Sequence, residues 1–229
     1  MTSGVQKDIY EGLVGIDLNI RPGAYEIKVL GTDGEGKVYR GDLRLKVKKA
    51  DFKTQRLSLP SPMVDLDAAT LERVEREERQ LKALFRGIRE EKLWSGPFVR
   101  PVPGEITTGF GLRRVINGQP RNPHTGVDLR GEKGTPVKAC NSGVAVLVAP
   151  LFFSGNSVIL DHGWGIYSMY FHLSDTLAVE GDRVRTGAVL GRVGSTGRST
   201  RPHLHWAVRI NGARVDPLSL LRLTKDLRE

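Results

Sequence analysis

The sequence of 229 residues contains a single cysteine, Cys140, and no long apolar run. One cysteine excludes an internal disulfide and leaves the compartment open, because a reduced cytosolic protein and a disulfide-free periplasmic protein look alike in this respect. The longest apolar runs, such as residues 143–150, are far shorter than the roughly 20 residues that a membrane helix needs. We therefore expect no stable membrane insertion in these residues.

Several functional signatures are also missing. There is neither a phosphate loop nor a dinucleotide fingerprint, and no strand–helix alternation, so a doubly wound nucleotide-binding fold is excluded. The H-E-x-x-H pattern of helical zinc proteases is absent as well. Residues 1–10 are polar, with no basic flank before an apolar stretch, so no secretory signal is visible. We expect any export signal to belong to a longer precursor.

Negative charge is in deficit. The net charge is +9, and residues 97–229 contribute most of the excess, with 17 Lys and Arg against 10 Asp and Glu. A basic surface attracts polyanions of every kind. Because the sequence has no run of about five or six basic residues and no nucleic-acid motif, we expect no nucleic-acid partner.

The 27 glycines and 12 prolines disfavour a bundle of long helices, and the chain divides into three segments. Residues 1–50 alternate apolar and polar side chains, as at 13–20 and 43–47, which predicts three or four antiparallel strands. We expect a small sheet or part of an immunoglobulin-like module there. The segment has no histidine and no carboxylate cluster, which favours a structural or interaction role.

Residues 51–96 are predicted to be a helical linker. From Asp67 to about Lys92, apolar residues recur at helical spacing, with Glu and Arg on the other face. Asp67 or Thr70 is suited to cap the first turn, and residues 95–97 end the pattern. The apolar positions are Leu71, Val74, Leu81, Leu84 and Ile88.

Residues 97–229 hold all five histidines and consist of short apolar strands separated by glycines. Residues 181–191 follow a pattern that is shared with the hybrid barrels of biotin- and lipoate-carrying domains, but lack the modified lysine. The fold class is therefore predicted to be mainly β, with an antiparallel β-sandwich or hybrid-barrel domain at residues 97–229. The expected strands lie at 143–148, 157–160, 165–171, 188–193 and 205–210.

One histidine and one aspartate are spaced to share a strand face. An extended chain places His124, Gly126 and Asp128 on the same side, and the glycine leaves room between the imidazole and the carboxylate. These two groups can therefore converge on one ion.

A second pair has the same period. His203 and His205 share one face, while Leu204 and Trp206 point toward a core. Imidazole and carboxylate suit zinc, and three protein ligands with one open position are typical of a catalytic zinc site. The spacing alone leaves open whether His203 or His205 binds the metal.

The remaining motifs, together with these, resemble the lysostaphin-type (LytM-like) zinc metalloendopeptidases, which cut cross-bridges or stem peptides of peptidoglycan. The resemblance runs over residues 97–222. It includes residues 108–114 before the first motif, residues 134–137 after it, the Tyr-Phe-His at 170–172, and the run that ends in His203-Leu204-His205. His162, in a turn at 161–165, falls outside these motifs and is interpreted as structural, with its ring bonded to nearby backbone.

The resemblance implies a role for each residue. It makes His124, Asp128 and His205 the ligands of one zinc ion per chain, and His172 and His203 the catalytic pair. Zinc activates a water and polarises the scissile carbonyl, while the two histidines act as general base or acid and as oxyanion stabiliser. The expected partner is a peptidoglycan peptide, and we expect a monomer in the periplasm, secreted, or otherwise in the cell envelope.

The main alternative is a non-catalytic, wall-associated regulator of an amidase. Degenerate proteins of this fold that act in that way lack one or more of the five residues, and all five are present here. Two departures from the family pattern remain. Arg201, near Arg198, stands where a small residue is usual, and is either a partner for a substrate carboxylate or a solvated charge. No tyrosine occurs at 111–123 to assist an oxyanion.

Overall fold

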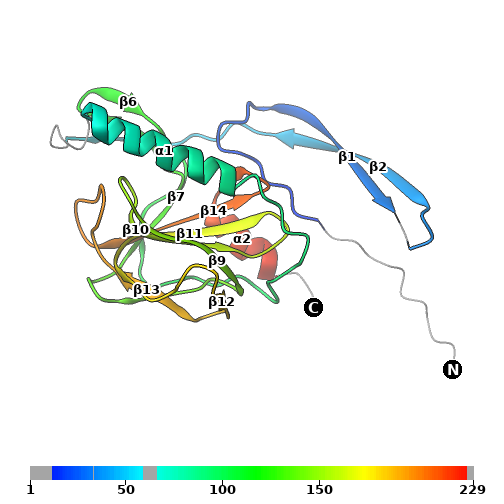
Figure 1. The fold of residues 1–229 in the computed structure, drawn as a ribbon. Coiled ribbons are helices and arrows are strands. Elements are labelled where there is room, and N and C mark those ends of the chain that lie inside the picture. The colour runs from blue at the N-terminus through cyan, green and yellow to red at the C-terminus, as the bar shows by residue number, and fades with distance from the viewer. Residues whose placement is uncertain (1–11, 33, 59–65, 226–229) are drawn as a thin grey trace. The chain divides into compact units, whose positions relative to one another are not determined.

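The structure, a computed structural model, describes residues 12–32, 34–58 and 66–225. Strands predominate there, which confirms the predicted mainly β class (Figure 1). Residues 19–53 form one compact unit, and the segment up to residue 18 together with residues from 54 onward forms the other. The elements of the larger unit are β3 (Thr54–Leu57), α1 (Ala68–Leu84), β4 (Ile106–Thr108), β5 (Arg113–Ile116), β6 (Gln119–Arg121), β7 (Gly126–Arg130), β8 (Pro136–Lys138), β9 (Gly143–Leu151), β10 (Gly155–Asp161), β11 (Ile166–Thr176), β12 (Arg183–Val184), β13 (Val189–Val193), β14 (His203–Ile210), β15 (Ala213–Val215) and α2 (Pro217–Lys225).

The smaller unit is an antiparallel hairpin of β1 (Gly23–Thr32) and β2 (Val38–Val47). Three or four strands were predicted over residues 1–50, and the described part of that range contains these two. The prediction of a strand at 13–20 is wrong. Within the larger unit, Leu13 packs against the core, and Gly15 lies so close to β14 that an added Cβ would be 2.5 Å from the Ile210 carbonyl oxygen.

The larger unit is built on one antiparallel sheet in the order β12-β9-β10-β11-β14-β7-β4, with β13, β8 and β15 paired at its sides. One face of this sheet covers the main core, which includes Val127, Tyr170 and Trp206. The opposite face packs a second apolar cluster against α1, and Leu81 and Leu84 are its helical members. The five strands predicted in this region correspond to β9, β10, β11, β13 and β14.

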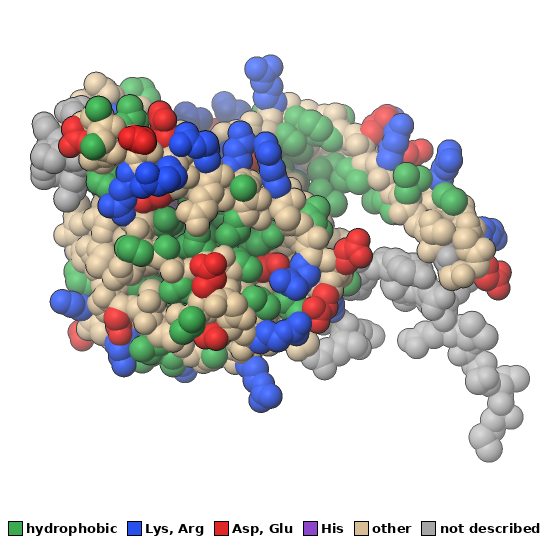
Figure 2. Space-filling view, viewed as in Figure 1, with side chains coloured by type: hydrophobic (Ala, Val, Ile, Leu, Met, Phe, Trp, Pro, Cys, Tyr) green, Lys and Arg blue, Asp and Glu red, His purple; other side chains and the backbone are tan. Residues whose placement is uncertain are grey.

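Helix α1 begins as predicted, because the Asp67 side chain accepts a hydrogen bond from the Thr70 backbone N–H at 2.7 Å. It ends at Leu84 rather than near residue 92. The Tyr167 hydroxyl there donates to the carbonyl oxygen of Gly87 at 2.7 Å, and Ile88, placed on the predicted apolar stripe, is exposed. The outward face of α1 carries side chains of both charges (Figure 2). No described helix is long and apolar enough to cross a membrane.

A small sheet of β3, β5 and β6 was not predicted, and it places a strand inside the segment expected to be a helical linker. Strand β3 pairs in parallel with β5, with Thr54 opposite Arg113 and Leu57 opposite Ile116. Strand β3 has four residues, too few to show in the sequence the alternation of apolar and polar side chains that indicates a strand. Helix α2 was not predicted either; its Leu220 is buried in the main core.

His162 has the structural role expected for it. Its ring contacts the Ser142 carbonyl oxygen at 2.7 Å through Nδ1 and the Ser168 hydroxyl at 2.7 Å through Nε2. Burial lowers the pKa of His162 to about 4. The ring is therefore neutral near pH 7 and serves the packing between β10 and β11.

Candidate metal centre

The register between β7 and β14 places Asp128 directly opposite His205. Both residues point away from the main core. Their neighbours along the strands, Leu204 and Trp206 on β14 and Val127 on β7, are completely buried in that core, and successive side chains of a strand alternate between its faces. Oδ1 of Asp128 and Nδ1 of His205 are 2.8 Å apart. The alternation predicted from the sequence thus brings these two groups together.

His124 completes the cluster from the residues just before β7. Its Nε2 lies 2.9 Å from Asp128 Oδ1 and 2.9 Å from His205 Nδ1, while its Nδ1 is 2.8 Å from the Gly109 carbonyl oxygen. Because a carbonyl only accepts, Nδ1 carries the proton and Nε2 presents a lone pair. A carbonyl on the outer nitrogen is the usual support of a metal-binding histidine.

These three donors fit a zinc ion in kind and number. Two imidazole nitrogens and one carboxylate oxygen converge within 4.8 Å of one another, all on buried residues. Three ligands of this type leave one position open, which is the pattern of catalytic zinc sites. The cluster is therefore able to hold a metal ion.

Gly126 gives the cluster its space. A Cβ at this position would lie 2.8 Å from Nε2 of His205 and 2.4 Å from the Trp206 carbonyl oxygen. Both distances are too short for a side chain, so glycine is required between His124 and Asp128, as the spacing of the motif suggested.

Local electrostatics keep Asp128 and His205 in the protonation states that metal binding requires. Burial alone would raise the pKa of Asp128, but hydrogen bonds with His124 and His205 outweigh it and hold that pKa well below its usual range. Burial lowers the pKa of His205 to about 4, against the opposing effect of Asp128. The Phe171 ring lies parallel to that of His205, with ring centroids 5.7 Å apart. Near pH 7 Asp128 is therefore a carboxylate and His205 a neutral imidazole.

His172 reaches the same region through an irregularity of β11. Asn156 pairs with Leu173 and Val158 with Tyr170, so two residues of β11, Phe171 and His172, face a single residue of β10. This bulge redirects the His172 side chain toward the site. The backbone of His172 has φ = 64°, a left-handed conformation that costs about 1–3 kcal/mol.

His172 and His203 are adjacent, with ring centroids 4.9 Å apart. Nδ1 of His172 is 2.8 Å from the Thr196 carbonyl oxygen, and Nδ1 of His203 is 2.8 Å from that of Arg201. Each ring therefore carries its proton on Nδ1 and leaves Nε2 free to accept one. Nε2 of His203 lies 3.6 Å from Asp128 Oδ1. Burial, with smaller effects of His205 and His203, lowers the pKa of His172 to about 3.

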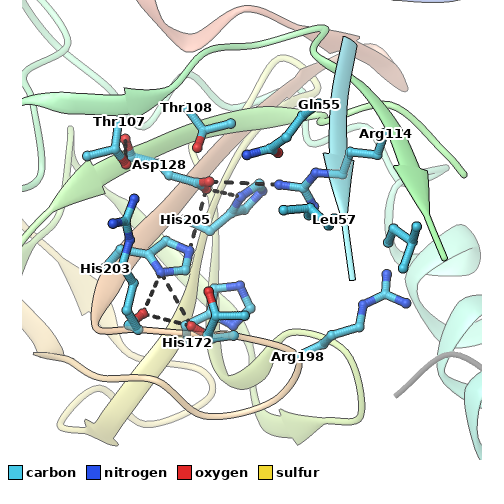
Figure 3. A pocket seen from close by; sticks show the side chains of 14 residues that line it. Gln55, Leu57, Thr107, Thr108, Arg114, Asp128, His172, Arg198, His203 and His205 are labelled. Atoms are coloured by element: carbon cyan, nitrogen blue, oxygen red, sulfur yellow. Dashed lines mark hydrogen bonds and ion pairs between the residues drawn. The ribbon is translucent and has the colours of Figure 1, made fainter. Parts of the chain in front are cut away.

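The site opens into a cleft with several further side chains (Figure 3). Sequence reasoning did not identify Gln55 and Leu57 of β3 or the role of Arg114, although Arg114 ends one of the family motifs. His124 lies behind the cleft and does not line it. The lining residues are Gln55, Leu57, Thr107, Thr108, Arg114, Ile116, Asp128, His172, Arg198, Ser199, Thr200, Arg201, His203 and His205.

Residues 122–217 match the profile of Peptidase family M23, and this range contains all five histidine and aspartate residues of the site. A crystal structure from Pseudomonas aeruginosa, described as a peptidase M23, is 34% identical and superposes with a TM-score of 0.72, covering 91% of this chain and 77% of that one. The chain belongs to peptidase family M23. The family resemblance predicted from the histidine motifs is thereby confirmed.

Curated relatives of this M23 chain are longer. It is 45% identical over 124 residues to the DD-carboxypeptidase/endopeptidase Mpg of Neisseria meningitidis, covering 54% of this chain and 29% of the relative. It is 38% identical over 114 residues to the peptidoglycan DD-endopeptidase ShyA of Vibrio cholerae, covering 49% and 26%. The chain thus spans less than a third of the length of either protein.

The close packing at Gly126 generates a test. Gly126→Ala should lower the free energy of unfolding by about 1–3 kcal/mol, because β14 or the His205 ring must move. Gly109→Ala is the control, since a Cβ added at Gly109 would have nothing within 4 Å. This variant should change the free energy of unfolding by less than about 0.5 kcal/mol. Urea unfolding of both variants measures the difference. Equal stability of the two would contradict the packing described here.

Proposed function

We propose that this protein is a zinc-dependent endopeptidase that hydrolyses peptide bonds in peptidoglycan, in cross-bridges or stem peptides. The observation that carries the proposal is the convergence of five side chains at one site: three candidate metal donors, of which Asp128 and His205 line the cleft, and two further imidazoles that are not needed to hold the metal. The relatives named as peptidoglycan DD-endopeptidases support the choice of substrate. Since peptidoglycan lies outside the cytoplasmic membrane, the proposal also places the protein in the cell envelope.

His124 through Nε2, Asp128 through Oδ1 and His205 through Nδ1 would hold the zinc ion. When bound, zinc lowers the pKa of a water molecule and polarises the carbonyl group of the scissile amide. The carbonyl of Gly109 orients the His124 ring, and Phe171 packs along the His205 ring. These contacts keep the donors in place before substrate arrives.

His203 and His172 handle the protons. Each ring is held at Nδ1 by a backbone carbonyl, so Nε2 is the nitrogen that can accept a proton as a general base. After it accepts a proton, the same nitrogen becomes a donor, which can stabilise an oxyanion or protonate the leaving amine. Their separation is short enough for both rings to contact one scissile group.

Metal content distinguishes the two kinds of histidine. Wild-type protein should contain one zinc per chain, and His205→Ala, which removes one of three ligands, should lose it. His203→Ala should keep the metal. Elemental analysis after dialysis measures this. If His203→Ala lost zinc while His205→Ala retained it, the ligand assignment would be reversed, and if neither lost it, this pair would not contain a ligand.

Activity should follow a different pattern. Dye release from purified peptidoglycan should stop on chelation without unfolding of the protein, and return with zinc. His203→Ala and His172→Ala should each lower kcat by roughly 10²- to 10⁴-fold, the usual cost of losing a positioned acid or base. If both histidines act on one proton-transfer step, the fold-loss of kcat in the double variant should be smaller than the product of the fold-losses of the two single variants. Wild-type protein that binds no zinc and releases no dye would favour the non-catalytic regulator instead.

A further inference from the structure

The charges that line the cleft do not balance. Among the described residues of its lining, three are arginines, Arg114, Arg198 and Arg201, and Asp128 is the one acidic residue. Asp128 is also a metal donor of the proposed site, so its charge is shared with a cation. Positive side chains therefore outnumber negative ones among the described lining residues, which favours an anionic ligand beside the reacting groups.

Arg114 is held at the cleft by the small sheet. It lies on β5, its side chain is 27% exposed, and its Nη2 is 3.8 Å from Asp128 Oδ2. Its Nε is buried and has no hydrogen-bond partner among the described residues. Burial lowers the pKa of Arg114, while Asp128 acts in the opposite direction. A guanidinium with an unused buried donor is costly to keep, unless a ligand completes its contacts.

Arg198 approaches from the loop between β13 and β14. Its guanidinium lies over the Phe153 ring, 4.1 Å from the centroid, and its backbone N–H donates to the Phe153 carbonyl at 2.9 Å. Burial lowers the pKa of Arg198, and the positive charges of Arg114 and Arg121 lower it further. Arg114 and Arg198 line the same cleft, although they come from different elements. Figure 3 shows both on the side of the cleft opposite His203.

The loop that carries Phe153, whose ring lies under Arg198, is anchored to α1. Glu77 accepts a hydrogen bond from the Phe152 backbone N–H at 2.8 Å, and the same glutamate pairs with Arg73 at 2.7 Å. The loop that carries Phe153 is thus anchored to the helix. Arg198 is positioned in advance rather than left as a mobile surface charge, which is what recognition of a fixed anionic group requires.

We infer that Arg114 and Arg198 form a subsite for a carboxylate of the peptide substrate, so that the protein selects acidic peptides at this cleft. The inference rests on the proposed function. A guanidinium fork matches a carboxylate with two parallel hydrogen bonds, and both arginines line the cleft that a carboxylate of the substrate would enter. The carboxylate can be the C-terminus of the peptide or an acidic side chain.

The test compares synthetic stem peptides that differ in one group: both carboxylates free, the C-terminus amidated, or the acidic side chain amidated. Amidation of the bound carboxylate should lower wild-type kcat/KM by roughly 10- to 100-fold. Arg198→Gln should lower kcat/KM for the free peptide to a similar extent. It should leave kcat/KM nearly unchanged for the peptide that is amidated at the bound carboxylate, because that contact is already lost. Arg114→Gln should have the same effect on kcat/KM as Arg198→Gln. Because Arg114 contacts Asp128, a proposed zinc ligand, the zinc content of this variant is measured as well.

Arg113→Gln is the matched control, since Arg113 is the exposed neighbour of Arg114 on β5 and does not line the cleft. It removes the same charge and should leave the preference among the peptides intact. An equal loss with Arg113→Gln, or an equal loss on every peptide with Arg198→Gln, would overturn the subsite, because the arginines would then act through diffuse attraction or through folding.

Binding separates this inference from the proposed function. Calorimetry with zinc-loaded His203→Ala protein should show tighter binding of the free peptide than of one amide, and Arg198→Gln in that background should abolish the difference. If this discrimination held but wild-type protein hydrolysed none of the peptides, the proposed function would fail and the subsite would stand. Equal affinity for all three peptides would overturn the subsite, whatever the hydrolysis assay showed.

Discussion

The antiparallel register between β7 and β14 is the constraint on which the site depends. Val127 and Leu129 on one strand, and Leu204 and Trp206 on the other, are completely buried on the core side. Burial of each such side chain contributes about 1.5–3 kcal/mol, so a slip of either strand by one residue, which would turn its two core side chains to the opposite face, is strongly disfavoured. The same register places Asp128 and His205, two of the three candidate metal donors, on the other face of these strands. The hydrophobic core and the metal cluster therefore specify one another.

A second layer of support links α1 to the cleft through the loop between β9 and β10. Glu77 holds the Phe152 backbone, the Phe153 carbonyl accepts from Arg198, and the Ser154 carbonyl accepts from the His172 N–H at 2.8 Å. One short loop thus positions the His172 imidazole and a cleft arginine at once. The left-handed backbone of His172 is maintained because the neighbouring pairs of β10 and β11 fix it on both sides. The helix contributes to the site without reaching it.

Period-two patterns carry much of this information in the sequence itself. They place His124 with Asp128, and His203 with His205, on shared faces, and the structure brings these faces together. His172 has no such signal, because its orientation comes from a bulge that depends on β10, and it was identified through the family resemblance alone. Strand β3 pairs in parallel with a strand far along the chain, so no local pattern marks Gln55 or Leu57 as cleft residues. The strand predicted at 13–20 fails for a similar reason: its alternation is real, but the segment packs on β14 and β15 without joining a sheet.

The central claim is that this cleft hydrolyses a peptide amide of peptidoglycan with the help of zinc. Mass spectrometry of purified peptidoglycan, digested by the zinc-loaded protein in heavy-oxygen water, tests it most directly. The account predicts fragments with a new amino terminus and a matching new carboxylate that carries one heavy oxygen, and no such fragments when a chelator is present. Fragments cut only in the glycan strand, or peptide cleavage that persists after complete removal of the metal, would contradict it.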